Sequence, residues 1–223
     1  MCIRDSVDPD KGAHERFLSL EMTWLNNTLL RAFVLSPRLG QISADLLSVP
    51  AIRLYHDNVL AKQAGCGRTP WHFDDQHFPL DTNDVVTAWI PAQPTPVEMG
   101  PLSFAYPLEV HKLVNAVKFE KAGAGYDRGV SEVFAKNDVT INETPFELGE
   151  VSFHHNLNFH TASQNRTNRS RVVLANTYYK DGARVINSPT MISGDWQKFM
   201  PNVKPGDLAA SPLNPICWPV DDE

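Results

Sequence analysis

From Ala51 onward the chain consists of short apolar runs separated by turn-forming residues, and this pattern constrains the fold more than any other feature. Each run is too short for a buried helix, which takes about ten residues or more, but has the length of a strand. The runs are Ile52–Tyr55, Val85–Ile90, Leu102–Ala105, Val151–Phe153 and Val172–Tyr178. The stretch 91–101 contains four prolines and must connect elements, because proline cannot donate to a β-ladder. The sequence therefore predicts a mainly β domain.

Two segments before these runs have helical spacing instead. Apolar residues in Glu15–Arg31 recur near a helical period, which predicts an amphipathic helix, and Pro37–Leu47 predicts a second one. Residues Val114–Asp138 could hold another short helix or a long loop, and the chain after Tyr179 is rich in turn-forming residues. We expect one β domain with flanking N-terminal helices and an irregular tail.

Composition excludes several classes of protein. The chain has 223 residues, 42% hydrophobic and 21% charged, which is typical of a single folded domain over residues 1–223. A net charge of -6 without a basic stripe argues against nucleic-acid binding. No apolar stretch reaches the ~18 residues of a membrane span, and the first residues lack a secretory signal. Three irregularly spaced cysteines fit a reducing environment, so we expect a cytoplasmic protein.

The segment Trp71–Asp74 contains a histidine and a carboxylate two residues apart. In an extended strand such residues point to the same face, so His72 and Asp74 can aim at one point. A further histidine would complete the two-histidine, one-carboxylate set that binds non-haem iron(II). The pair alone does not define a site, because about one such spacing is expected by chance in a chain with eight histidines.

Three histidines further along the chain could supply the missing ligand, namely His154, His155 and His160. We favour His160 because Arg171 follows it by eleven residues and opens an apolar strand. Arginine is rarely buried without an anionic partner, so this side chain indicates an anion in the interior. Arg169 is the competing anion binder, and either His154 or His155 could replace His160.

The order and spacing of these residues resemble the phytanoyl-CoA dioxygenase family. The resemblance runs from about residue 36 to the C-terminus, and it rests on several segments spread over that part of the chain. These are Arg53–Asp57, Lys62, Thr69–Asp74, Val86–Pro91, Glu98–Leu102, His160, Gln164–Thr167 and Arg171. Many members of this family have serine two residues after the distal histidine, where this chain has Ala162.

The resemblance implies a double-stranded β-helix, or jelly roll, that binds iron(II) and 2-oxoglutarate and uses dioxygen. It implies that His72, Asp74 and His160 are the metal ligands and that Arg171 pairs with the distal carboxylate of 2-oxoglutarate. Further candidates for the cosubstrate pocket are Lys62, Thr87, Trp89 and Ser163.

The implied activity is hydroxylation of an unactivated C–H bond in a small molecule. The presence of Asp74 argues against halogenation, since halogenating relatives have lost this carboxylate. Two alternatives stay open: a non-redox, cupin-like binding protein on the same fold, or an inactive family member. We also expect the domain to lack the strands with which family members begin, and residues 1–12 to be non-native or disordered.

Overall fold

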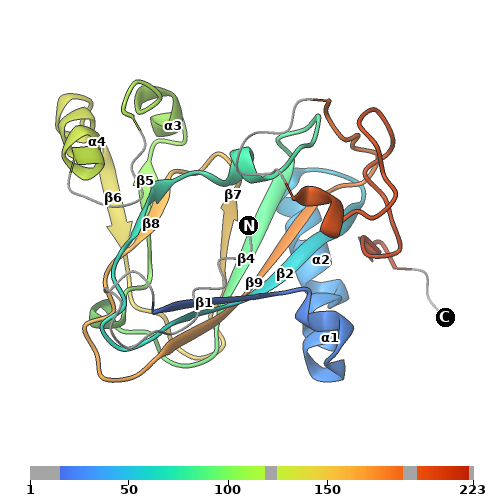
Figure 1. The fold of residues 1–223 in the computed structure, drawn as a ribbon, viewed down its shortest axis with the longest axis horizontal. Helices are drawn as coiled ribbons and strands as arrows, with labels where there is room; N and C mark the ends of the chain where they lie inside the picture. The colour runs from blue at the N-terminus through green and yellow to red at the C-terminus, as the bar shows by residue number, and fades with distance from the viewer. Residues whose placement is uncertain (1–15, 119–124, 188–194, 221–223) are drawn as a thin grey trace.

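A computed structural model describes residues 16–118, 125–187 and 195–220 and places them around two antiparallel β-sheets (Figure 1). The strands are β1 Phe17–Glu21, β2 Ile52–Lys62, β3 Thr69–His72, β4 Val85–Pro91, β5 Leu102–Tyr106, β6 Thr140–Glu143, β7 Ser152–His155, β8 His160–Ala162, β9 Arg171–Lys180 and β10 Ile216–Trp218. Every predicted strand run thus lies in or overlaps a strand. The mainly β jelly roll is confirmed.

Helices are short and lie mainly outside the sheets. They are α1 Thr28–Val34, α2 Pro37–Leu47, α3 Val110–Leu113 and α4 Gly125–Lys136, with 3-10 turns η2 Thr23–Leu25, η3 Asp74–His77, η4 Val97–Met99 and η5 Trp196–Lys198. The prediction for α2 is confirmed to the residue: Pro37 suits its first turn, and Ser48 ends it in a left-handed conformation. The side chain of Asn27 caps α1.

The two sheets divide the strands unequally. The larger sheet has the order β1-β2-β9-β4-β7, with β10 also paired to β2, and the smaller one has the order β3-β8-β5-β6. Strands close in sequence lie in different sheets, as in β3 and β4 or β7 and β8, which is the crossing pattern of a jelly roll. Trp89 and Val173 of the larger sheet pack with Ala162 of the smaller sheet, so these faces form a shared interior.

The outer face of the larger sheet packs against the N-terminal helices. Leu54, Leu174 and Tyr178 contribute to this core, and the Tyr178 hydroxyl donates to the carbonyl of Val34 in α1 at 2.8 Å. Residues at alternate positions face the other way because side chains alternate along a strand. The sheet therefore has one face for the helices and one for the interior.

A polar row crosses the inner face of the larger sheet. Cross-strand register places His56 opposite Thr177, Thr177 opposite Thr87, and Thr87 opposite His154. The hydroxyls of Thr87 and Thr177 lie 3.0 Å apart. Four neighbouring strands thus bring polar side chains to one level of the interior.

The predicted helix over Glu15–Arg31 is wrong in its first part. Residues 17–21 form β1, which pairs with β2 through partners such as Leu18 with Ala61, and only residues 28–34 are α-helical. Met22 between them is left-handed, with φ at 55°. Pairing with the long β2 satisfies the backbone groups of β1, and such tertiary contacts override a local helical preference.

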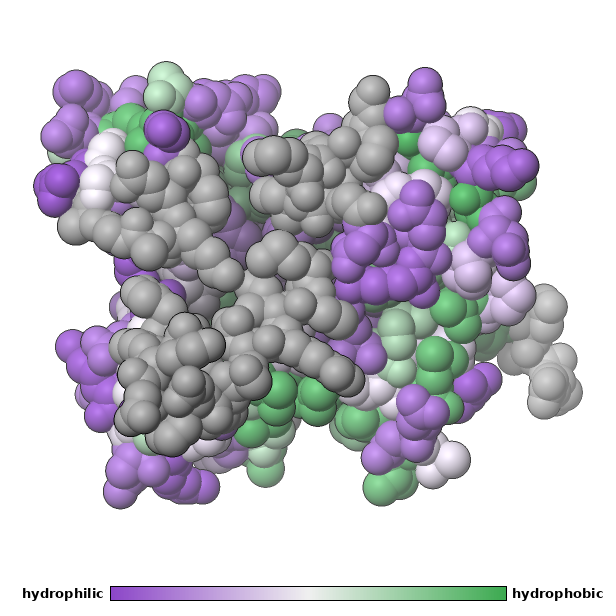
Figure 2. Space-filling view, in the orientation of Figure 1, coloured by the Kyte–Doolittle hydropathy of each residue, from purple (hydrophilic) through white to green (hydrophobic). Residues whose placement is uncertain are grey.

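Some of the apolar residues at the molecular surface belong to α1, at the lower right of the molecule in Figure 1, where Figure 2 shows green patches between purple ones. Leu29 and Phe33 of this helix are 79% and 58% exposed, whereas Val34 is fully buried. Helix α1 therefore covers the sheet with only one side, which explains why its apolar residues do not form a continuous buried stripe.

Apart from η5 and β10, the described residues after β9 are irregular, as expected for this tail. Phe199 and Met200 pack with Tyr55 and Tyr179 in one buried apolar cluster. Residues 1–12, which were predicted to be non-native or disordered, lie outside the described residues. No described helix has the length and apolar character needed to cross a membrane.

Gly40 lets α2 approach the tail closely, and replacing it by alanine is expected to destabilise the fold. A Cβ at this position would lie 2.3 Å from the backbone oxygen of Cys217 in β10. Alanine normally stabilises a helix relative to glycine, but overpacking costs about 1–3 kcal/mol. Urea unfolding should show lower stability for Gly40→Ala, whereas Gln41→Ala, at an exposed position of the same helix, should not. Equal stability of Gly40→Ala and the wild type would refute this packing argument.

Candidate metal centre

His72, Asp74 and His160 meet at one end of the smaller sheet. His72 ends β3 and His160 opens β8, and the two residues are cross-strand partners. Asp74 follows at the start of η3, where its N–H donates to the carbonyl of Asn156 at 2.7 Å. One potential ligand atom from each of the three side chains lies within 4.8 Å of the other two. The structure therefore brings together the residues that the sequence singled out.

Both histidines of this cluster present the same ring nitrogen to its centre. The Nδ1 atom of His72 contacts the carbonyl of Pro70 at 2.8 Å, and Nδ1 of His160 contacts that of Asn158 at 2.9 Å. A carbonyl oxygen only accepts, so Nδ1 carries the proton in each ring. Nε2 is then unprotonated and available as a metal ligand, in the orientation that backbone carbonyls impose on ligating histidines.

Electrostatics favour the ligand forms of these groups. Burial lowers the pKa of His160 to about 3, which keeps the imidazole neutral. Burial alone would raise the pKa of Asp74, but the neighbouring histidines, His160 first among them, hold that pKa well below its usual range. A neutral imidazole and an ionised carboxylate are the forms in which these residues bind metals.

His154 approaches the same carboxylate from the larger sheet. Its Nε2 lies 3.5 Å from Oδ2 of Asp74, and its ring centroid is 4.7 Å from that of His160. His155 lies on the opposite face of β7, where its Nδ1 accepts from the N–H of Leu157 at 3.2 Å. The structure thus brings His154, but not His155, to the cluster.

Arg171 is a buried cation of the interior, and its side chain is incompletely paired. It is 2% exposed, and Nη1 donates to the carbonyl of Gly100 at 2.7 Å. Its guanidinium lies 5.3 Å from the centroid of the Trp89 ring. Nε has no hydrogen-bond partner among the residues that the structure describes, and burial lowers the pKa to about 10. These donors fit an anionic ligand. Arg169, by contrast, is exposed.

Lys62 lies beside Arg171 as its partner across β2 and β9. It is 1% exposed, and Nζ donates to the carbonyls of Ala162 and Ser163 at 2.8 and 2.7 Å. These hydrogen bonds connect the end of β8 to the larger sheet. His160 lies at the start of the same short strand. This contact gives Lys62 a structural role next to the predicted cosubstrate pocket.

The protonation of Lys62 is expected to make stability depend on pH. Burial, together with the charge of Arg171, lowers the pKa of Lys62 from 10.5 to about 7. Between these values the unfolded chain binds a proton that the folded chain has lost, so folding becomes more favourable as the pH rises. Urea unfolding without cosubstrate should show the wild type gaining stability over Lys62→Met across this range. A difference that does not change with pH would contradict the lowered pKa.

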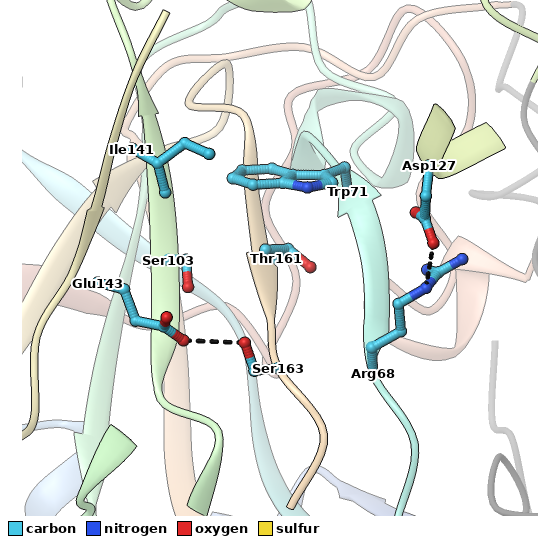
Figure 3. A pocket seen from close by; sticks show the side chains of 8 residues that line it. All are labelled: Arg68, Trp71, Ser103, Asp127, Ile141, Glu143, Thr161 and Ser163. Atoms are coloured by element: carbon cyan, nitrogen blue, oxygen red, sulfur yellow. Dashed lines mark hydrogen bonds and ion pairs between the residues drawn. The ribbon is translucent and has the colours of Figure 1, made fainter. Parts of the chain in front are cut away.

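Ser163 does not face the interior, although the sequence suggested it as a cosubstrate contact. Its hydroxyl donates to Glu143 at 2.9 Å, and both residues line a pocket with Trp71 and Thr161 (Figure 3). His160 and Ala162 point inward from β8, so the intervening and following residues point outward. Only the backbone carbonyl of Ser163 contacts an interior side chain, that of Lys62.

Sequence reasoning missed the part that Gly100 plays. Its carbonyl accepts from Arg171, its φ is 73°, and a Cβ there would lie 2.2 Å from the backbone oxygen of Ser163. Only glycine suits a left-handed position with such close backbone contact. The signal in the sequence was the Met99–Pro101 turn, which marks a connection but not its contact with an arginine far along the chain.

A jelly roll that gathers two histidines and one carboxylate has the architecture of the non-haem iron(II) oxygenases. The chain belongs to the phytanoyl-CoA dioxygenase family, whose model matches residues 8–173. The match begins well before residue 36, so the resemblance extends closer to the N-terminus than the motifs indicated. The predicted cofactors, iron(II), 2-oxoglutarate and dioxygen, are those of this family and are confirmed.

Solved structures with the same fold include two enzymes of nogalamycin biosynthesis. The non-haem α-ketoglutarate-dependent carbocyclase SnoK is 24% identical, with a TM-score of 0.73 over 92% of this chain and 78% of SnoK. The epimerase SnoN, solved with Fe3+, α-ketoglutarate and nogalamycin RO, is 20% identical, with a TM-score of 0.70 over 93% of this chain and 80% of SnoN.

A more distant neighbour, EctD from S. alaskensis with bound Fe, is 14% identical, with a TM-score of 0.62 over 78% of this chain and 60% of EctD. Identities this low establish the shared fold and leave the reaction open. No curated protein matches the chain.

Proposed function

We propose that this protein is an iron(II)- and 2-oxoglutarate-dependent dioxygenase that hydroxylates an unactivated C–H bond of a small molecule. His72, Asp74 and His160 would hold the iron, and Arg171 would bind the distal carboxylate of 2-oxoglutarate. The observation that carries the proposal is the joint presence of the ligand cluster and a buried, incompletely paired arginine in one interior.

The cluster fits a divalent metal in both charge and orientation. The two Nε2 atoms are unprotonated because carbonyls hold the Nδ1 protons, and Asp74 supplies a negative charge. Two histidines and one carboxylate leave coordination positions open on iron(II) for cosubstrate and dioxygen.

The surroundings of Arg171 fit one end of a dicarboxylate. Trp89 lies against the guanidinium, and Thr87 lies further along the same strand at the level of the polar row. The hydroxyl of Thr87 already forms a hydrogen bond with the hydroxyl of Thr177. The role of Thr87 would therefore be to form part of the pocket wall. We assign to Lys62 the role of holding β8 in place. We do not include the Ser163 hydroxyl in the cosubstrate pocket.

In the proposed reaction, one oxygen atom of dioxygen enters the C–H bond of the substrate and the other enters succinate, while 2-oxoglutarate loses carbon dioxide. Within this reaction the side chains would bind and orient: the triad would hold the metal, Arg171 would hold the far end of the cosubstrate, and the apolar side chains that pack between the sheets would limit access of water. SnoK and SnoN are described as a carbocyclase and an epimerase, so hydroxylation is the part of the proposal that product analysis must test.

A non-redox, cupin-like binding protein accounts for the metal cluster less completely. Such a protein would need the triad but no second, buried cation with unused donors. Arg171 therefore favours the oxygenase, because an unpaired buried charge destabilises a fold unless a ligand compensates for it.

An anaerobic titration with iron(II) and 2-oxoglutarate tests the proposal directly. We expect a visible charge-transfer band only when both are present, and succinate after air is admitted. The absence of both the band and succinate would refute the proposal. A band without succinate would support the binding sites for iron(II) and 2-oxoglutarate and would indicate an inactive family member. A product heavier by one oxygen atom, with a new hydroxyl-bearing carbon in its NMR spectrum, would establish hydroxylation.

A further inference from the structure

We propose that His154 is a positioning residue for Asp74, donating from Nε2–H to the carboxylate oxygen that does not bind the metal. This inference rests on the proposed metal site and adds a function to a residue outside the ligand triad. With this hydrogen bond in place, Asp74 would bind the metal through its other oxygen.

The two oxygens of Asp74 face different histidines. Nε2 of His72 and Nε2 of His160 both have Oδ1 as their nearer oxygen, at 3.6 and 3.9 Å. Nε2 of His154 lies 3.5 Å from Oδ2. The carboxylate is therefore oriented with one oxygen toward the ligand pair and the other toward the larger sheet.

The hydrogen-bonding of the rings distinguishes His154 from the two ligand histidines. In His72 and His160 a backbone carbonyl takes the Nδ1 proton, which leaves Nε2 as a lone pair. Nδ1 of His154 is buried and has no partner among the described residues. A buried N–H without an acceptor is costly, so the proton of a neutral His154 belongs on Nε2, beside the carboxylate. His154 is thus arranged as a donor and not as a ligand.

The His154 side chain is buried and held by contacts on several sides. It is 5% exposed, pairs with Thr87 across β7 and β4, and lies against the ring of Phe104 at a centroid distance of 5.6 Å. Asn156, just after β7, accepts the backbone N–H of Asp74. One short segment of the chain therefore contacts both the backbone and the side chain of Asp74.

A carboxylate held in this way leaves one more coordination position open than a carboxylate that binds through both oxygens. Together with His72 and His160, a carboxylate that binds through one oxygen would leave positions on the metal open for other ligands. Residues that orient a metal ligand typically contribute about 10–100-fold to metal affinity.

Two nearly isosteric variants test the donor directly. His154→Gln keeps an N–H near the position of Nε2, and His154→Met removes it. With Co(II) as the probe, we expect His154→Met to bind about 10–100-fold more weakly, with an altered visible d–d spectrum. His154→Gln should retain most of the affinity and the wild-type spectrum. Thermal unfolding of each variant shows that it is folded, and His154→Leu replaces His154→Met if the latter is not.

His155→Met is the matched control, because it makes the same change on the opposite face of the same strand. It should bind Co(II) like the wild type. Equal Co(II) affinities for the folded Gln and Met variants of His154 would overturn the inference, since the donor would then have no effect. A wild-type chain that does not bind Co(II) would overturn the metal site itself and this inference with it.

Discussion

Replacing His72 by alanine is expected to abolish succinate production and to weaken Co(II) binding by more than the ~100-fold upper limit typical of residues around the ligands. The loss follows from removing one of three side chains whose ligand atoms lie within 4.8 Å of one another. The His72 side chain is 28% exposed, so its truncation leaves a smaller cavity than truncation of the buried His160. Isothermal titration with Co(II) and a succinate assay measure the two effects.

His77→Ala is the matched control for this experiment. His77 ends η3, three residues after Asp74, and it is not a member of the ligand cluster. The same truncation there should leave Co(II) affinity unchanged. If His72→Ala bound Co(II) as tightly as the wild type, the metal would lie elsewhere, and the proposed centre would be wrong.

Local sequence patterns predicted those parts of the fold that local physics determines. Helix α2 was predicted to the residue because an amphipathic run follows a proline and ends before another proline. The strand β9 was predicted because Val172–Tyr178 is a run too short for a buried helix. Each of these signals lies within a single segment of the chain.

Contacts between distant segments were not predictable in the same way. Strand β1 is extended because β2 offers it partners about forty residues away, as Leu20 with Val59, and nothing within residues 17–21 encodes that pairing. Gly100 likewise meets Arg171 only after the two sheets have come together. In both cases a tertiary contact decides the local conformation.

The candidate site shows the same division. The spacing of His72 and Asp74 is a local signal, and the distal His160 was selected through its spacing to Arg171. His154 and His155 are adjacent in a strand, so only one of them can face the interior. Which one does so depends on the register of β7 with β4, where His154 pairs with Thr87.

Arg171→Met is expected to weaken 2-oxoglutarate binding strongly while leaving Co(II) affinity unchanged. Methionine keeps the apolar stem against Trp89 but removes the charge and the donors, including the one that binds the Gly100 carbonyl. Hydrogen bonds to a charged group contribute about 1.5–3 kcal/mol, which corresponds to roughly 10–100-fold in affinity. The charge-transfer band measured against 2-oxoglutarate concentration under anaerobic conditions gives the dissociation constant.

Arg169→Met serves as the control, because it removes an equal charge from an exposed position two residues away. It should bind 2-oxoglutarate like the wild type, which separates a specific contact from a general loss of positive charge. Lys62→Met tests the other candidate for binding the distal carboxylate, Lys62 itself. If the affinity for 2-oxoglutarate survived in Arg171→Met and fell in Lys62→Met, the lysine would be the anion binder. The unpaired Nε of Arg171 would then need another explanation.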